Sequence, residues 1–556
     1  MNRVPRLAPW SACCFVLLLV LVANPARAEY LGNITFSQPS PARLPHGLHV
    51  DVSIDYKIDD PAGRRIYVIP YTGGAPSPGY AVSGSVVHAT GTGTASAYLT
   101  ITAGEVIVDE VRVYSRDPDF TETPLEVFVP VHFEFGPHGI YNIDVDRSRY
   151  SRLPHGMDLH MTFDFATSEP GCRIYARPFS SGHLTPGYAA SGSAALPSSG
   201  SSSQYFSFDG DADITHIRFQ MFADDNTTLL REFFVPWPAA WRQWGVYDIT
   251  FNHDTLTSLH HDQQLVSSFT IDHEDPDGVR VWTMGVAGGS YVPGLAYQGS
   301  ILEPAGAHDI TRYWRVNSGT TVGEAVRFVV GDGDLVYDTF DVPLRIYYGP
   351  HALQDFAFTP APPAILSWGE TLDMTFGYVT DQTEGVRIFA RAAYQEEPLM
   401  GMTSAGSPLY PAPSGSGDFW MYYGADRTAD SIRFQMVSDD QSELLLQWFQ
   451  PGWFIWSGSG TVTGVEGPPA AVVMGRAYPN PFNPTATIPV AVGADTPVRI
   501  ALYDVRGRLA RVIHDGLLPA GDHALPVDGT GLGSGAYVCR LETRGGVQTQ
   551  RLTLVK

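Results

Sequence analysis

Pairs of aspartates recur along the chain at a regular spacing, and they are the first residues whose type suggests chemistry. Clustered carboxylates on loops can bind Ca²⁺, which takes roughly six to eight oxygen ligands. Two carboxylates per turn are few for a complete site, and aspartate also suits hairpin turns because it caps its own backbone. Hairpin turns are the simpler interpretation, and calcium stays open as the one cofactor to test. The calcium candidates are Asp224, Asp225, Asp332, Asp334, Asp439 and Asp440.

Three tyrosines recur at a glycine-rich turn and are candidate ligand contacts. Tyr80, Tyr188 and Tyr297 belong to copies of the same glycine motif. Exposed aromatic rings on β-sandwich domains can stack against sugars, whereas a buried ring under a turn would recur equally well. Both interpretations stay open: exposed rings favour adhesion, and buried rings favour a structural spacer.

Catalytic signatures are missing from the sequence. It contains no Gly-x-Ser-x-Gly elbow, no His-Glu-x-x-His helix, no phosphate-binding loop and no Cys-His pairing. The serines of the glycine motif, such as Ser83 and Ser85, would give four equivalent nucleophiles, which is not expected of an enzyme. His46 and His155, in Leu-Pro-His-Gly segments, lie too far apart to share a metal in an extended chain, and we expect turns there. We therefore expect a protein that is not an enzyme.

The elements that position these residues form a fourfold repeat. Three short motifs return in the same order, and the arginines that open the first motif are separated by 108, 107 and 107 residues. Such a recurrence indicates four copies of one domain. The first motif begins at Arg65, Arg173, Arg280 and Arg387; the second ends at Ser85, Ser193, Ser300 and Ser407; the third centres on Arg112, Arg218, Arg327 and Arg433.

Each copy has the pattern of β-strands. Apolar and polar residues alternate from Val50 to Tyr56 and again from Leu159 to Phe165, the period of a strand with one buried face. Long helical periods are absent, and the 56 glycines and 43 prolines interrupt the chain every few positions. We expect an all-β protein built from tandem Ig-like β-sandwich domains of about 107 residues. The expected boundaries are 29–138, 139–245, 246–352 and 353–456.

A linker of glycine, serine and proline is predicted at 457–474, before a last domain at 475–556. The boundaries between the four copies carry no comparable spacer. Aromatic residues gather near two of the copy ends, at Trp237 to Trp244 and Trp448 to Trp456, and suit packing of domain against domain. We therefore expect a fairly stiff rod of four units with a looser tail.

Residues 1–28 have the features of a secretory signal peptide. Arg3 and Arg6 precede a short apolar run, and Ala26-Arg27-Ala28 forms a small-x-small cleavage site before Glu29. The run is too short for a stable transmembrane helix, and no later segment approaches the roughly 20 apolar residues of a span. We expect export, and no membrane-spanning segment after cleavage.

The charge of the chain excludes some partners. Removal of residues 1–28 deletes three arginines and no acidic residue, so the formal charge of −23 becomes about −26. A chain this acidic repels phosphate backbones, and nucleic-acid binding is not expected. Two of the four cysteines leave with residues 1–28, and Cys172 and Cys539 fall in different predicted domains. We expect no disulfide between them.

The C-terminal segment carries the most specific motifs. An extended run from Tyr478 to Pro484 is followed by Tyr-Asp-x-x-Gly at 503–507, Ala-Gly-x-His at 520–523 and Gly-x-Tyr at 535–537. These motifs, over about 80 residues, resemble the C-terminal sorting domain of the Por (type IX) secretion system and its sister family, the FlgD-like Ig domain. The matching residues are Tyr478, Pro479, Asn480, Pro481, Phe482, Asn483, Pro484, Tyr503, Asp504, Gly507, Gly521, Gly535 and Tyr537.

The resemblance implies where the protein is delivered more than what activity it has. It implies an Ig-like domain that an outer-membrane translocon reads, and a protein that passes through the periplasm to the cell surface or the medium. Together with the repeats it favours a non-catalytic protein of adhesive or structural type, with surface glycans or other surface proteins as partners. A carbohydrate-binding protein that uses its repeated aromatic residues is the alternative, and an enzyme of unrecognised type is a more distant one.

Overall fold

The computed structural model shows a protein made of β-strands. None of the described residues forms a helix, and so none forms a helix able to cross a membrane. The expected all-β fold is confirmed. The structure describes residues 29–120, 125–180, 182–261, 263–458, 472–474, 482–492, 496–504, 509–518, 521–543 and 546–555. The predicted signal peptide and most of the predicted linker lie outside these ranges.

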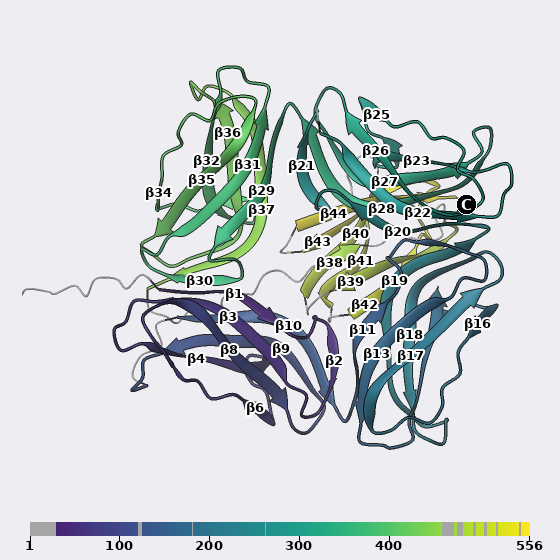
Figure 1. Ribbon diagram of the computed structural model, residues 1–556, viewed down its shortest axis with the longest axis horizontal. Coiled ribbons are helices and arrows are strands. Elements are labelled where there is room, and N and C mark those ends of the chain that lie inside the picture. Colours follow the sequence, from purple (N-terminus) through teal and green to yellow (C-terminus); the bar gives the residue numbers. More distant parts are fainter. Residues whose placement is uncertain are drawn as a thin grey trace, which may run out of the picture.

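Strands β1 to β37 fall into four equivalent sets, which we call repeats 1 to 4 (Figure 1). Repeat 1 consists of β1 (Tyr30–Phe36), β2 (Ala42–Pro45), β3 (Val50–Ile58), β4 (Arg64–Thr72), β5 (Ala75–Pro76), β6 (Tyr80–Val82), β7 (Val87–His88), β8 (Gly91–Ile101), β9 (Val106–Arg116) and β10 (Glu126–Gly136). Repeat 2 consists of β11 (His138–Val145), β12 (Arg152–Pro154), β13 (Leu159–Thr167), β14 (Arg173–Ser180), β15 (His183–Leu184), β16 (Tyr188–Ala190), β17 (Ser199–Phe208), β18 (Ala212–Phe222) and β19 (Leu229–Arg242).

The later repeats follow the same order of long and short strands. Repeat 3 consists of β20 (Trp244–Phe251), β21 (Leu256–His260), β22 (Leu265–His273), β23 (Arg280–Ala287), β24 (Ser290–Tyr291), β25 (Leu295–Tyr297), β26 (Gly306–Val316), β27 (Thr321–Gly331) and β28 (Val336–Gly349). Repeat 4 consists of β29 (His351–Thr359), β30 (Ala364–Ser367), β31 (Leu372–Thr380), β32 (Val386–Tyr394), β33 (Glu397–Pro398), β34 (Met402–Ser404), β35 (Ser414–Tyr423), β36 (Arg427–Ser438) and β37 (Leu444–Ser457).

Each repeat is a sandwich of two sheets around its own core. In repeat 1, β1, β3, β8 and β6 form one sheet, and β2, β10, β9, β4 and β5 form the other, with β2 parallel to β10. The alternation of the sequence explains the two faces: Val50, Val52 and Ile54 on β3 are buried, whereas Asp51 between them is exposed. Each of the four repeats has its own cluster of buried apolar residues.

The first strand of every repeat bends at a left-handed residue. Asn33, Asn142, Asp248 and Asp355 have φ between 46° and 55°, and each lies where the ladder of that strand shifts register. Asparagine and aspartate tolerate this geometry better than other residues with a Cβ atom. In repeat 1 the Asn33 amide also donates to Asp55 at 2.8 Å. This fourfold position was not recognised in the sequence.

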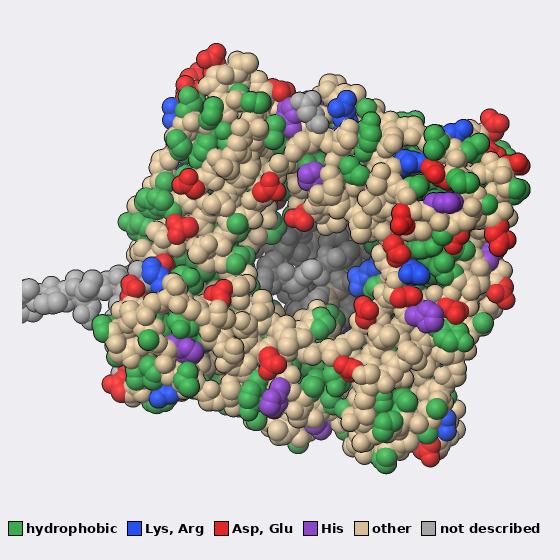
Figure 2. Space-filling model, in the orientation of Figure 1, with side chains coloured by type: hydrophobic (Ala, Val, Ile, Leu, Met, Phe, Trp, Pro, Cys, Tyr) green, Lys and Arg blue, Asp and Glu red, His purple; other side chains and the backbone are tan. Residues whose placement is uncertain are grey.

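Three of the four junctions between neighbouring repeats are shared sheets, and the repeats form a closed ring. One sheet joins repeat 1 to repeat 2, a second joins repeat 2 to repeat 3, and a third joins repeat 4 back to repeat 1 through β30 and β1. Figure 1 shows the four repeats around a common centre, and Figure 2 shows an opening in the middle of that face. The prediction of an extended rod is wrong, because the first strand returns to pair with the last repeat.

The strand at the junction between repeats 4 and 1 is buried on both faces. On β30, Ala364 and Leu366 belong to the core of repeat 4, whereas Ile365 between them belongs to the core of repeat 1, together with Trp453 and Ile455 of β37. Because successive side chains point to opposite faces of a strand, the shared sheet carries one core on each side. We call the junction between repeats 4 and 1, which no linking peptide spans, the seam.

The junction between repeats 3 and 4 uses a side chain in place of a direct ladder. Ser258 of β21 occupies the position of Ile365 in its repeat, next to the first strand of repeat 4. Its hydroxyl accepts a hydrogen bond from the Leu353 N–H at 2.7 Å and donates to the Leu353 carbonyl at 2.6 Å. Beside it, His260 faces Asp381 of repeat 4 at 2.9 Å. The fourth contact of the ring is therefore made by polar side chains.

The C-terminal strands pair only with one another among the described residues, in a three-stranded and a four-stranded sheet. Their common core contains Ile488, Ile500 and Leu541 among its fully buried side chains. The strands are β38 (Val472–Met474), β39 (Thr485–Val492), β40 (Thr496–Asp504), β41 (Leu509–Leu518), β42 (Gly521–Asp528), β43 (Gly535–Thr543) and β44 (Gly546–Leu554).

Candidate functional site

The first two sequence motifs meet in a clamp between an arginine and a serine. In repeat 3, Arg280 donates to the Ser300 carbonyl, and Ser300 Oγ accepts the N–H of Val281 at 3.0 Å. The same hydroxyl donates to the carbonyl of Ile301 at 3.1 Å. The motif serines are thus engaged with the backbone of the neighbouring strand. Equivalent clamps join Arg65 to Ser85, Arg173 to Ser193 and Arg387 to Ser407.

The aspartates proposed for calcium lie at the tips of the hairpins that join β18 to β19, β27 to β28 and β36 to β37. Asp225 Oδ1 accepts the N–H of Thr228 at 2.8 Å, and Asp332 Oδ1 accepts the N–H of Leu335 at 2.8 Å. Asp440 receives the N–H of Ser442 at 3.1 Å. The remaining members cap or pair locally: Asp334 donates its N–H to Asp332, Asp224 lies 3.7 Å from Arg173, and Asp439 lies 2.8 Å from Arg387.

These contacts stabilise the charged carboxylates. The Thr228 hydroxyl, with backbone N–H groups, holds the pKa of Asp225 well below its usual range, and the Leu335 N–H lowers the pKa of Asp332. The Ser438 hydroxyl, followed by Ser442, lowers the pKa of Asp440 to about 2. Among the described residues no group of three or more His, Cys, Asp or Glu is placed to hold a metal ion. The observed role of these aspartates is to cap turns, and calcium binding stays a prediction.

The three tyrosines chosen from the sequence do not occupy one equivalent position. Tyr80 opens β6 opposite Ile101 and is 38% exposed. Tyr188 opens β16 in the same way, but its ring is half-buried against Phe208. Tyr297 ends β25 opposite Trp314 and is 47% exposed, at the place that Val82 takes in repeat 1. The apparent threefold recurrence therefore joins two different positions of the short strand, two residues apart.

A different aromatic position recurs in all four repeats. Tyr98, Tyr205, Tyr313 and Trp420 follow one another at steps of 107, 108 and 107 residues and lie at the same register on β8, β17, β26 and β35. Each of them points outward, since its neighbours along the strand belong to the core. The constant spacing could have revealed them in the sequence, but they lie between the recognised motifs in otherwise variable strands.

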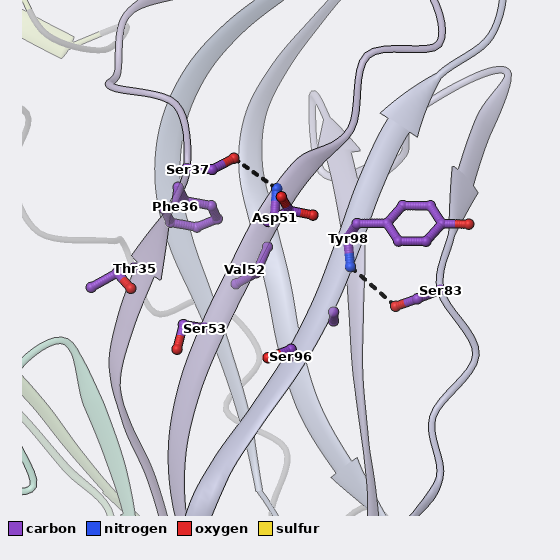
Figure 3. A pocket seen from close by; sticks show the side chains of 10 residues that line it. Thr35, Phe36, Ser37, Asp51, Val52, Ser53, Ser83, Ser96 and Tyr98 are labelled. Atoms are coloured by element: carbon purple, nitrogen blue, oxygen red, sulfur yellow. Dashed lines mark hydrogen bonds between the residues drawn. The ribbon is translucent and has the colours of Figure 1, made fainter.

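A hollow of about 520 Å³ lies on the outer face of β1, β3 and β8 in repeat 1. Figure 3 shows Thr35, Ser53 and Ser96 over the three strands, with Tyr98 extending from β8. Ser37 Oγ accepts the N–H of Asp51 at 2.9 Å, so this side chain closes the irregular end of β1. The hollow is lined by hydroxyl groups and the Asp51 carboxylate together with the apolar side chains of Phe36, Val52 and Ala97.

Repeat 4 has a smaller hollow of about 150 Å³ at the equivalent place, on β29, β31 and β35. Its outward residues include Thr359, Asp373, Thr375, Asp418 and Trp420. Asp373 lies directly opposite Trp420 across the ladder, as Asp51 lies opposite Tyr98 in repeat 1. Repeats 1 and 4, which flank the seam, thus share an aspartate and an aromatic ring on the same face.

The histidines of the Leu-Pro-His-Gly segments bind neighbouring turns. Nε2 of His46 donates to the Gly104 carbonyl at 2.6 Å, and Nε2 of His155 lies 2.8 Å from Asp211. His261 in repeat 3 makes the equivalent contact with the Gly319 carbonyl at 2.7 Å. The histidines occupy one place in repeats 1 to 3, where repeat 4 has Trp368, and they fasten one turn to the next.

The C-terminal domain brings together several of the motif residues. Phe482 is 1% exposed, its N–H donates to the Thr553 carbonyl at 2.8 Å, and its carbonyl accepts the N–H of Val555 at 3.0 Å. A Cβ at Gly529 would come within 2.9 Å of the Phe482 ring, so the turn must be glycine there. The tyrosine of the late motif, Tyr537, donates to the Gly533 carbonyl at 2.8 Å.

The other sorting residues divide between strand ends and undescribed segments. Tyr503 and Asp504 end β40, and Gly521 and Gly535 open β42 and β43. Asn483 and Pro484 are exposed directly after Phe482. Tyr478, Pro479, Asn480, Pro481 and Gly507 lie outside the described residues.

Neither cysteine of the described residues forms a disulfide. Cys172 and Cys539 are buried, and burial raises the pKa of the Cys539 thiol to about 12. Each packs in the core of its own domain.

Residues 476–555 match the family model of the secretion system C-terminal sorting domain. The resemblance found in the C-terminal motifs is confirmed, and the chain carries a type IX sorting domain at this end. A domain of this kind implies that the protein is exported to the cell surface or secreted. No curated protein matches the chain.

Solved structures give only distant likenesses. Escherichia coli alpha-2-macroglobulin activated by porcine elastase is 12% identical, with a TM-score of 0.19, over 95% of this chain and 53% of that chain. A marsupial T cell receptor is 10% identical, with a TM-score of 0.17, and the match covers 55% of this chain and 99% of that chain. Salmonella alpha-2-macroglobulin reacted with methylamine is 10% identical, with a TM-score of 0.16, over 94% and 40%. The chain thus spans about half of the first of these proteins, and TM-scores this low carry no further argument.

Proposed function

We propose that this is an exported, non-catalytic protein of adhesive or structural type, which presents a ring of four β-sandwich repeats at the cell surface or in the medium. The sorting domain at 476–555 is the observation that carries the proposal. Residues 1–28 serve as the signal peptide that leads the chain to the periplasm, and the outer-membrane translocon is the partner of the C-terminal domain.

The repeats support a binding or spacing role. Their recurrent serines are engaged in clamps, and their recurrent aspartates cap turns. What varies between repeats is the set of side chains on the outer faces, such as Asp51, His160, Val266 and Asp373 at one equivalent position. A fixed scaffold with variable faces is the arrangement expected of a recognition or adhesion protein.

Deletion of the sorting domain tests the export part of the proposal. A chain lacking residues 475–556 should accumulate in the periplasm, and residues 457–556 fused to a reporter that carries a signal peptide should reach the surface. Cell fractionation and surface proteolysis measure both. Normal surface delivery of the truncated chain would contradict the sorting role.

Attachment of the purified full-length protein to cells tests the adhesive part. Adhesion requires saturable binding to a surface of the host or of neighbouring bacteria. Absence of binding to every surface would leave the structural role, with the ring acting as a spacer. Carbohydrate binding is the second candidate function, favoured by the outward aromatic residues on the repeats.

A further inference from the structure

The geometry of repeat 4 points to a glycan site: we propose that the outer face of β29, β31 and β35 binds uncharged oligosaccharide chains, with Trp420 and Tyr422 as the stacking platform. The proposal rests on the adhesive role proposed above and names the chemical class of its ligand.

The platform is formed by two rings of one strand. Trp420 and Tyr422 are two residues apart on β35 and point to the same outer face, with ring centroids 6.1 Å apart and planes inclined by only 6°. The two rings are nearly parallel and stacked, so together they present one apolar surface on the outer face. A pyranose ring has an apolar face of C–H groups and a polar edge, and it fits such a surface better than a compact pocket.

Trp420 and Trp368 are the two exposed tryptophans among the described residues. Trp241, Trp314 and Trp456 are fully buried in their cores, whereas Trp420 is 36% exposed. Leaving a large aromatic side chain in water gives up the free energy of burial, which is about 25 cal/mol for each Å² of apolar surface. A ligand that covers the ring recovers this free energy, and an exposed aromatic pair marks such a surface.

Polar acceptors lie next to the platform. Asp373 is directly opposite Trp420 in the ladder, and Asp418 precedes Trp420 by two residues on the same face. Neither carboxylate forms a salt bridge among the described residues, so both can accept hydrogen bonds from sugar hydroxyls. The hydroxyls of Thr359 and Thr375 lie in the same hollow and can donate as well as accept.

Charge selects among the classes of glycan. The chain has a formal charge of −23, and acidic side chains outnumber basic ones on the face shown in Figure 2. No lysine or arginine lines the hollow. Sulfated sugars and uronic acids would therefore meet repulsion without a compensating cation. Neutral sugars escape this penalty, so uncharged chains fit this face better than acidic ones.

The other repeats show why repeat 4 is the site. In repeat 1, His49 stacks on Tyr98 with centroids 3.8 Å apart and an angle of 5°, so one face of that ring is already covered. In repeat 2, His160 approaches Tyr205 at 5.4 Å. Repeat 3 places Val266 opposite Tyr313, where the other repeats have a polar residue. Only repeat 4 combines two adjacent outward rings with two carboxylates among the described faces.

A glycan array with full-length protein is the first measurement. The array should contain neutral, amino-bearing, uronic and sulfated oligosaccharides, and titration calorimetry should follow with the best neutral hexasaccharide. We expect binding to neutral chains only. Trp420→Ala should weaken that binding by at least about tenfold, because it removes one of the two stacked rings.

Matched variants separate recognition from folding. Trp368 is 38% exposed, but its indole donates to Asp426 in a turn, so Trp368→Ala should leave the affinity unchanged. Asp373→Asn keeps the shape of the hollow and should weaken binding less than Trp420→Ala does. Binding by none of the neutral glycans, or equal binding by Trp420→Ala and the unmodified protein, would overturn the inference. An empty array together with saturable attachment to cells would overturn this site alone and leave the adhesive role standing.

Discussion

The junction between repeats 1 and 2 and the seam between repeats 4 and 1 have the same strand geometry and opposite chemistry. At the linked junction, Arg43 of β2 stacks on Phe233 at 4.8 Å and lies 3.5 Å from Glu134. At the seam the equivalent residue is Ile365, which is fully buried in the core of repeat 1. Where a peptide joins two repeats, a polar contact is sufficient. At the seam, where no peptide joins the two repeats, strand β30 is apolar on both faces.

The linked junction between repeats 2 and 3 follows the first pattern. Arg152 of β12 lies 3.0 Å from Asp338 and over the ring of Phe340 at 4.2 Å. A peptide linker keeps the local concentration of the partner high, so a modest contact holds the pair. The seam joins segments 338 residues apart in sequence, and it depends more on the free energy of burial.

A charge at the seam should have the largest effect. Ile365→Asp places a carboxylate in the core of repeat 1, which should cost about 4 kcal/mol at the seam. We expect the ring to open while repeats 2 and 3 keep their fold, and the radius of gyration from small-angle X-ray scattering to increase. Ile107→Asp, at a position 49% exposed, is the control and should leave the ring closed. Unchanged scattering by Ile365→Asp would show that the seam does not depend on apolar burial.

Loss of an arginine at a linked junction should have a smaller effect. Arg152→Ala leaves Asp338 partly buried without its closest cation, and it should reduce the free energy of unfolding by about 2 kcal/mol. Urea unfolding measures this change, and scattering should show an intact ring. Arg147, 3.6 Å from the more exposed Asp248 at the same junction, is the control, with a loss below about 1 kcal/mol. Ring opening in Arg152→Ala would contradict the difference between the two kinds of junction.

Acid should destabilise the two junctions that carry a buried or half-buried histidine. His138 and His351 open repeats 2 and 4, whereas Glu29 holds the equivalent place at the seam. Burial lowers the pKa of both histidines below the unfolded value of about 6.5. The native state therefore binds fewer protons than the unfolded state, and its stability falls as the pH drops below about 6.5.

Denaturant unfolding at pH 7.5 and pH 5.0 measures the effect of acid. His351→Gln should reduce the loss of stability between the two pH values, because the glutamine cannot be protonated. His183→Gln, at an exposed position, should reproduce the pH dependence of the unmodified protein. An identical pH dependence in both variants would mean that other groups cause the acid sensitivity.

The ion pair at the seam should have the smallest effect. Lys57 lies 2.9 Å from Glu370 across the seam, and the lysine is one-third exposed. Glu370 is only 5% exposed, but burial already raises its pKa, so it can take up a proton when the lysine is removed. Lys57→Gln should therefore cost only about 1 kcal/mol, less at high salt. A double-mutant cycle with Glu370→Gln measures the coupling. A coupling above about 2 kcal/mol would show that charge, and not Ile365, holds the seam.

Much of the fold within a repeat could be predicted from sequence. The alternation from Val50 to Tyr56 gave a strand with one buried face, and the spacing of Arg65, Arg173, Arg280 and Arg387 gave four copies, since both patterns reflect contacts within a repeat. Ring closure was missed because a repeat pattern does not say whether its ends meet. The one local signal was Ile365 at the place of Arg43, and it has meaning only once the partner strand is known.

The candidate sites also divide into features that a local sequence pattern predicts and features that depend on the pairing of distant strands. The aspartate pairs were correctly seen as turn residues because Asx caps are local chemistry. The aromatic candidates were chosen beside a conspicuous glycine motif, and Tyr297 was aligned with Tyr80 although it lies two residues further along. Trp420 and Tyr422 lie in a strand without a motif, and their significance comes from the register across β31 and β35.

The seam also fixes an order of events during biogenesis. The outer edge of β1 finds its partner β30 only after some 338 further residues have been made, so this contact has a very long range in sequence. Until then repeat 1 presents unpaired backbone groups and an apolar edge, the surface on which chains aggregate. A chain that emerges from its N-terminus therefore needs protection for its first repeat until the fourth arrives.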